Sequence, residues 1–236
     1  MFKVIFFTYI IIHIPDNAFA WGPMTHSYLA NEMLRYLALL PPEVSIIIKN
    51  FKQDFIYGNI MADSIMGKRY MPKEKQSHSW GFAQALTQKV STSSEMAFVY
   101  GYICHLAADT VAHRELTLKM RDFQHTWIEF LADSLVDKTN RVKSLTINRI
   151  VQKRNDRFLK KRFPSHMVSF DTHKRLFKGF LILSALANFS NVPKINIDRK
   201  KICKLHEESI LRMIDILSNG FDSFVVKEDP FPFQDA

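Results

Sequence analysis

The stretch that most constrains the fold is "SSEMAFVYGYICHLAADTVAHREL", residues 93–116. It is apolar on almost every side, and a helix with that character is buried in a protein interior. Yet His105, Asp109 and His113 recur within it at intervals of four, which places all three on one helical face. Two imidazoles and a carboxylate are costly to bury unless they are paired or bind a metal. The pattern therefore predicts a central helix that carries a polar stripe, with other helices packed around it.

Composition favours further helices over strands, because the 236 residues include only 7 Gly and 9 Pro to make turns. Periodic apolar residues predict helices over 25–40, 42–51, 120–138, 144–162, 169–188 and 198–219, the last closed by Gly220. Residues 55–80, with Gly58, Gly67 and Pro72, are expected to be mostly loop. We therefore expect an all-α fold, a single compact multi-helix domain over residues 21–236.

The first 20 residues have the three parts of a secretory signal peptide. "MFK" is positively charged, "VIFFTYIIIHI" is a short apolar core, and "AFA" is a small-x-small cleavage pattern that ends at Ala20. An uncleaved anchor and a buried first helix are the alternatives. We expect an exported protein, secreted or periplasmic, free or held at a membrane surface. The two cysteines, Cys104 and Cys203, allow at most one disulfide, and Cys104 is expected to be a buried thiol.

A second His–acid pair follows the central helix, since "HTWIE" places His125 and Glu129 one helical turn apart. One such pair is weak evidence for a metal site. The chain, however, concentrates five of its nine histidines between positions 26 and 125, namely His26, His78, His105, His113 and His125. Imidazole and carboxylate ligands without thiolate suit zinc in an oxidising compartment.

The motifs "WGPMTH", "GNIMADS", "HSW", "GYICHLAADTVAHRE" and "HTWIE", within residues 21–129, resemble the zinc-dependent phospholipase C family. That family shares its fold and a trinuclear zinc site with the single-strand-specific zinc nucleases. The resemblance implies a secreted phosphodiesterase with up to three zinc ions that hydrolyses phospholipid headgroup phosphodiesters by a metal-activated water.

The resemblance also implies a set of ligands. For the first zinc they are the α-amino group and carbonyl of Trp21, His26 and Asp109; for the second, Asp63, His78, His105 and Asp109; and for the third, His113, His125 and Glu129. Asp109 would bridge two ions and is, with Asp63, a candidate catalytic residue. Asp63 stands at a family position described as a zinc ligand or a general base, and both roles stay open. Asp109 and His113 are four residues apart, whereas six separate the corresponding residues in the well-known members. Cleavage after Ala20 would create the amine of the first site.

Residues 141–178 hold twelve Lys and Arg against only Asp156 and Asp171. This basic segment is expected either to attract anionic lipid headgroups or nucleic-acid phosphates, or to be an ordinary solvated face. The main alternatives to a phospholipase are therefore a zinc nuclease acting on single-stranded nucleic acid and a non-catalytic, zinc-stabilised module at a membrane surface. We expect a monomer in each case.

Overall fold

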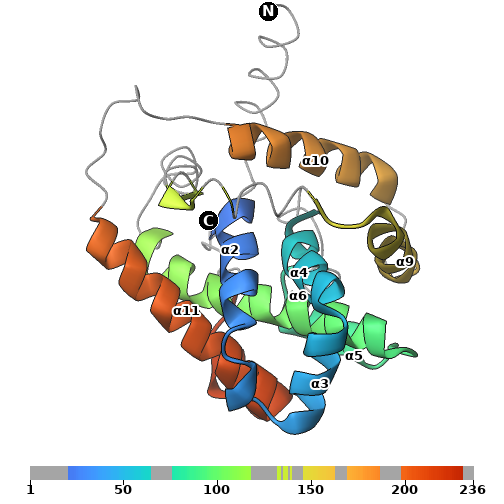
Figure 1. Ribbon diagram of the computed structural model, residues 1–236, viewed down its shortest axis with the longest axis horizontal. Coiled ribbons are helices and arrows are strands. Elements are labelled where there is room, and N and C mark those ends of the chain that lie inside the picture. Colours follow the sequence, from blue (N-terminus) through green and yellow to red (C-terminus); the bar gives the residue numbers. More distant parts are fainter. Residues whose placement is uncertain are drawn as a thin grey trace, which may run out of the picture.

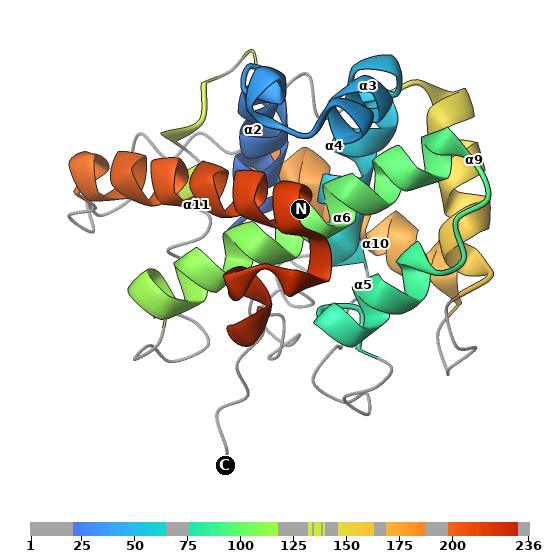
Figure 2. The same cartoon turned by 90° about the horizontal axis from the view of Figure 1, so that it is seen from below.

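The computed structural model describes residues 21–64, 76–117, 132–133, 135–137, 139, 146–162, 169–186 and 198–230. Within these residues the regular structure is entirely helical (Figures 1 and 2), which confirms the all-α prediction. The α-helices are α2 (Pro23–Met33), α3 (Pro42–Asn50), α4 (Lys52–Met61), α5 (Trp80–Thr87), α6 (Ser93–Ala112), α9 (Arg149–Lys160), α10 (Phe170–Leu186) and α11 (Arg199–Asn219). Short 3-10 turns are η1 (Leu37–Leu39), η2 (Ala62–Ser64), η7 (Gly220–Asp222) and η8 (Phe224–Lys227), and η5 (His113–Thr117) is π-helical.

The central buried helix predicted from the sequence is α6. From Ala97 onward nearly every residue of α6 is buried, and the helix packs chiefly against α4 and α11. Its start is fixed by Thr92, whose side chain accepts a hydrogen bond from the Glu95 backbone N–H, while the Glu95 carboxylate accepts one from the Ser91 N–H. This reciprocal capping satisfies donors that have no partner within the helix.

The loop predicted over 55–80 is wrong for its first part, because residues 55–61 continue α4. The reason is the role of Gly58. A Cβ atom there would lie 1.9 Å from the Phe98 carbonyl oxygen on α6, and one at Gly101 of α6 would lie 1.9 Å from the Phe55 carbonyl oxygen. The two glycines therefore allow α4 and α6 to touch backbone to backbone, which is helix packing and not turn formation.

The first predicted helix, 25–40, is also too long, since α2 ends at Met33 and the chain continues as η1. Leu40 is extended, with φ −93° and ψ 157°, because the proline that follows disfavours a helical conformation there. The expected helix over 120–138 lies mostly outside the described residues. The other predictions agree with α3, α9, α10 and α11, and Gly220 ends α11 with φ +57° as expected of a terminating glycine.

None of the helices that the structure describes combines the length and apolar character of a membrane span. Cys104 is a buried free thiol, as expected, and Cys203 is an exposed one. The division of the chain into residues 1–20 and a domain over 21–236 stays a prediction.

Candidate metal centre

Four buried side chains from three parts of the chain meet beside α6. Asp63 comes from η2, His78 from the turn that precedes α5, and His105 and Asp109 from successive turns of α6. Each offers a donor atom, and these four atoms all lie within 4.8 Å of one another. None of the four side chains is more than 1% exposed.

The contacts converge on one oxygen of Asp109. Its Oδ2 atom lies 2.9 Å from Nε2 of His78 and 3.1 Å from Nε2 of His105, and the two Nε2 atoms are 2.8 Å apart. Asp63 approaches from further away, with Oδ1 3.4 Å from His78 Nε2 and 3.6 Å from His105 Nε2. Two imidazole nitrogens and two carboxylates facing one another without thiolate form a donor set that fits zinc.

The other oxygen of Asp109 faces a second pair of donors. Oδ1 lies 3.0 Å from Nε2 of His26 and accepts a hydrogen bond of 3.3 Å from the backbone nitrogen of Trp21. The His26 ring stacks on His105, with ring centroids 3.6 Å apart. One buried carboxylate therefore stands between two groups of nitrogen donors, which is the arrangement a bridging ligand requires.

Neighbouring hydrogen bonds hold these donors in place. The Trp21 indole is fully buried and donates to the Ala108 carbonyl at 3.1 Å and to Ser209 Oγ at 3.2 Å, which pins the start of α2 between α6 and α11. On the other side, the Tyr102 hydroxyl donates to the Ser77 carbonyl at 2.5 Å and so fixes the turn that carries His78.

Electrostatics within the cluster keep the Asp109 carboxylate charged. Burial would lower the pKa of His105, but the neighbouring Asp109 and Asp63 carboxylates outweigh burial and raise it from 6.5 to about 9. Burial alone would raise the pKa of Asp109, yet His105 and His26 hold it well below its usual range. Burial and the charge of Asp63 together raise the pKa of Tyr102 well above 10, so its hydroxyl stays a donor.

The structure thus brings together Trp21, His26, Asp63, His78, His105 and Asp109 of the nine positions expected from the sequence. His113 is buried and lies one turn beyond Asp109, at the start of η5. His125 and Glu129 lie outside the described residues.

Asp133 is a site neighbour that sequence reasoning missed. It is buried, and its carboxylate accepts hydrogen bonds from Met24 and Thr25, immediately before His26. The only signal available was an acid inside the apolar run "FLADSLV", and such a run does not reveal what the acid contacts.

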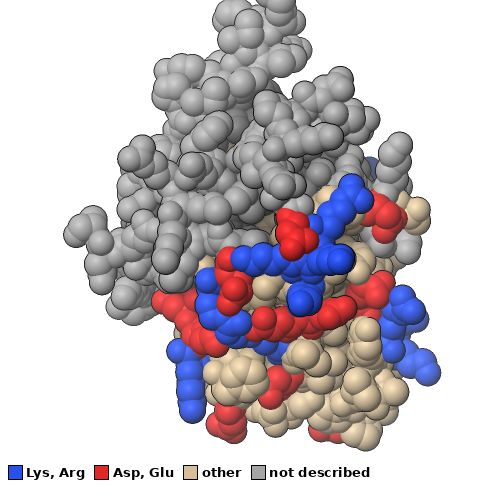
Figure 3. Space-filling view, turned by 90° about the vertical axis from the view of Figure 1, so that its left-hand side faces the viewer, with Lys and Arg blue, Asp and Glu red and all other residues tan. Residues whose placement is uncertain are grey.

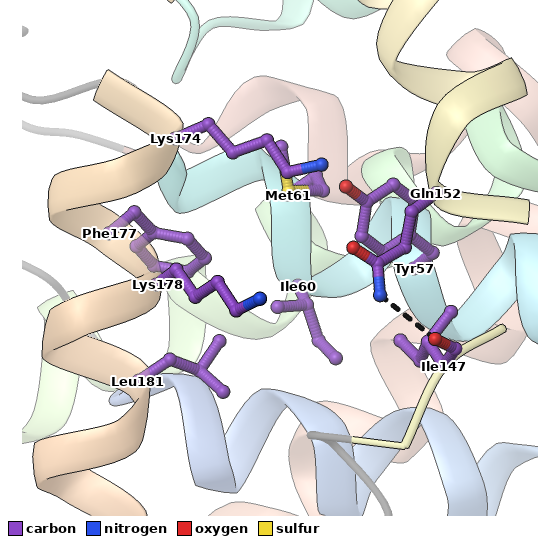
Figure 4. A pocket seen from close by; sticks show the side chains of 9 residues that line it. All are labelled: Tyr57, Ile60, Met61, Ile147, Gln152, Lys174, Phe177, Lys178 and Leu181. Atoms are coloured by element: carbon purple, nitrogen blue, oxygen red, sulfur yellow. Dashed lines mark hydrogen bonds between the residues drawn. The ribbon is translucent and has the colours of Figure 1, made fainter. Parts of the chain in front are cut away.

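A small pocket opens between α4, α9 and α10 (Figure 4), with a cavity volume of about 60 Å³. Its lining is mainly apolar, with two lysines and two other polar side chains: Tyr57, Ile60, Met61, Ile147, Gln152, Lys174, Phe177, Lys178 and Leu181. Lys174 forms an ion pair with Asp156, whereas the Lys178 side chain extends from α10 toward Ile60. α10 also packs against η2, the segment that carries Asp63. The pocket lining includes Met61, two residues before Asp63 in the sequence, but none of the four cluster residues.

Intramolecular ion pairs use several charges of the basic segment. Arg154 pairs with Asp54 and Lys160 with Asp171, in addition to the Lys174 pair. On the face of the molecule where α11 begins, positive and negative side chains are interspersed over the part that Figure 3 colours. Attraction of this protein to a membrane or to nucleic acid stays a prediction.

Comparison with known proteins gives one match. A family model described as zinc dependent phospholipase C matches residues 25–188, which include His26 and all four residues of the cluster but not Trp21. No curated protein and no solved structure matches the chain.

Proposed function

Because this chain belongs to the zinc-dependent phospholipase C family, we propose that it is an exported zinc phosphodiesterase that hydrolyses phospholipid headgroup esters. The observation that carries the proposal is Asp109, whose two oxygens face two separate groups of buried donors. A carboxylate is buried at this depth at high cost unless it serves such partners.

Two zinc ions account for the described donors. His26, Asp109 and the Trp21 amine would hold one, and His78, His105 and Asp109 would hold the other, with Asp63 next to it. A third ion on His113, His125 and Glu129 completes the proposal. Zinc pairs of this kind lower the pKa of a bound water and neutralise phosphoryl oxygens.

The chain's own side chains prepare this chemistry. Asp109 stays ionised across the physiological range, so it is always available as a ligand. Asp63 approaches the imidazoles less closely than Asp109 does, and we assign it the role of proton acceptor. Burial of all four side chains keeps bulk water from competing for these contacts.

Cleavage after Ala20 is part of the proposal, because it converts the Trp21 amide nitrogen into an amine that can bind metal. The test compares protein that begins at Trp21 with protein that carries one additional residue before it. We expect the extended form to bind one zinc fewer and to lose turnover. Equal zinc content and turnover would exclude the amine as a ligand.

The small pocket partly lined by Ile60 and Met61 supports phospholipid over nucleic acid as substrate, because its apolar walls suit lipid carbon and the Lys178 ammonium suits a lipid phosphate. The experiment measures release of phosphorylated headgroup from phosphatidylcholine vesicles and of nucleotides from single-stranded DNA, each with a chelator control. Headgroup release that the chelator abolishes supports the proposal. Release of nucleotides alone would indicate a nuclease. Release of neither headgroup nor nucleotides would indicate a non-catalytic module.

A further inference from the structure

The buried carboxylate of Asp133 lies over the beginning of α2, although the two are far apart in sequence. It accepts hydrogen bonds from the Met24 N–H at 3.1 Å, the Thr25 N–H at 2.8 Å and the Thr25 hydroxyl at 2.8 Å. The residue at the N-cap position of α2 is Gly22, which has no side chain to cap the helix. The Asp133 side chain, from a distant part of the sequence, therefore caps the N-terminus of α2, which has no capping side chain at its own N-cap residue.

The absence of a side chain at Gly22 makes room for this carboxylate. A Cβ atom on Gly22 would lie 2.4 Å from the Asp133 carboxyl carbon, closer than any real contact. The Asp133 side chain is thus seated directly against the backbone of residues 22–25. That short segment joins Trp21 to His26, and both of these residues direct a nitrogen at Oδ1 of Asp109.

Further contacts hold residues 21–26 at both ends. The His26 N–H donates to the Gly22 carbonyl at 3.1 Å, and this is the first hydrogen bond of the helix. The Trp21 indole holds the other end between α6 and α11. With these two contacts in place, the Asp133 hydrogen bonds fix the orientation of the helix start, and so the direction in which the Trp21 nitrogen and His26 point.

We propose that Asp133 is a positioning residue for the metal site formed by Trp21 and His26, a role that rests on the function proposed above. Its hydrogen bonds to Met24 and Thr25 act through the helix start that presents the proposed donors. Partners that orient metal ligands in this way typically change metal affinity by about 10–100-fold when they are replaced.

The test uses Asp133→Asn in protein that begins at Trp21. Asparagine keeps the size of the side chain but leaves one oxygen to accept three hydrogen bonds. We expect zinc affinity at the Trp21–His26 site to fall about 10–100-fold, with the second ion retained. Cobalt substituted for zinc should lose the absorption that His26→Ala also removes.

Asp54→Asn is the matched control for a purely structural effect. Asp54 is about as buried as Asp133, and it accepts hydrogen bonds from Arg154 and Asn155, neither of which is a proposed metal donor. We expect it to lower the melting temperature without changing zinc affinity or the cobalt spectrum. If Asp133→Asn behaves like Asp54→Asn, the positioning role is wrong.

A double-mutant cycle tests the contact itself. Gly22→Ala alone should weaken zinc binding at the Trp21–His26 site, as Asp133→Asn does. Adding Asp133→Ser should restore part of that affinity, because the shorter side chain makes room for the methyl group. Independent, additive effects would contradict the inference. Wild-type protein that holds no ion on Trp21 and His26 would instead overturn the proposed function, and this is measured before any variant.

Discussion

Replacing Asp109 with asparagine is the most informative perturbation of this protein. The change preserves the shape of the side chain and removes only its charge, so packing around α6 is retained. Asp109 is the nearest described carboxylate to three imidazoles, at 3.0 Å from His26, 2.9 Å from His78 and 3.1 Å from His105. We expect both proposed ions to be lost and turnover to fall to the level of chelator-treated protein.

In metal-free protein, the effect of Asp109→Asn on the free energy of unfolding follows from the pKa of His105. The rise from 6.5 to about 9 corresponds to about 3 kcal/mol of folding free energy, at about 1.4 kcal/mol for each pKa unit. Because this pKa is raised in the folded state, the stabilisation is fully present below pH 6.5 and is lost as the pH rises through 9. Asp109 is the larger of the two charges responsible, so Asp109→Asn should remove most of this dependence.

The assay is urea unfolding of chelator-stripped protein at pH 6 and at pH 9.5. Wild-type protein should lose about 3 kcal/mol between these values, and the variant much less. Calorimetric zinc titration of wild type at pH 7 in buffers of different ionisation enthalpy should show proton release, since zinc must displace the His105 proton. A wild-type stability that does not change with pH, together with zinc binding that releases no proton, would refute the electrostatic reasoning.

Three further predictions concern separate parts of the molecule. Asp63→Asn should keep its zinc and lose turnover by about 10²–10⁴-fold, measured by metal analysis beside a vesicle assay; loss of zinc would make Asp63 a ligand. Gly101→Ala should lower the free energy of unfolding by about 1–3 kcal/mol in thermal denaturation, since its methyl group meets the Phe55 carbonyl. Gly81→Ala on α5, with no atom within 4 Å of the added carbon, is its control and should be neutral or stabilising. Lys178→Glu should weaken hydrolysis of phosphatidylcholine vesicles through KM while zinc content is unchanged, and an unaltered KM would exclude the pocket as a substrate contact.

The sequence alone was enough to predict the helical class and the central position of α6. These follow from periodicity and composition, which act locally: an apolar surface on every side of a helix requires burial wherever the helix is placed. The spacing of His105 and Asp109 is likewise a local property, because four residues make about one turn. The candidate ligand positions before α6 were predicted from the resemblance of short motifs to the zinc-dependent phospholipase C family.

Tertiary structure alone decided which donors meet and what supports them. Gly58 and Gly101 have the local signature of helix breakers, and only the contact between α4 and α6 reveals that each makes room for a carbonyl oxygen of the other helix. In the sequence, Asp133 is one acidic residue in an apolar run. Only the fold places it over the start of α2, where it contacts Thr25, 108 residues earlier in the chain. Such contacts depend on where distant segments cross, and neither propensity nor spacing along the chain contains that information.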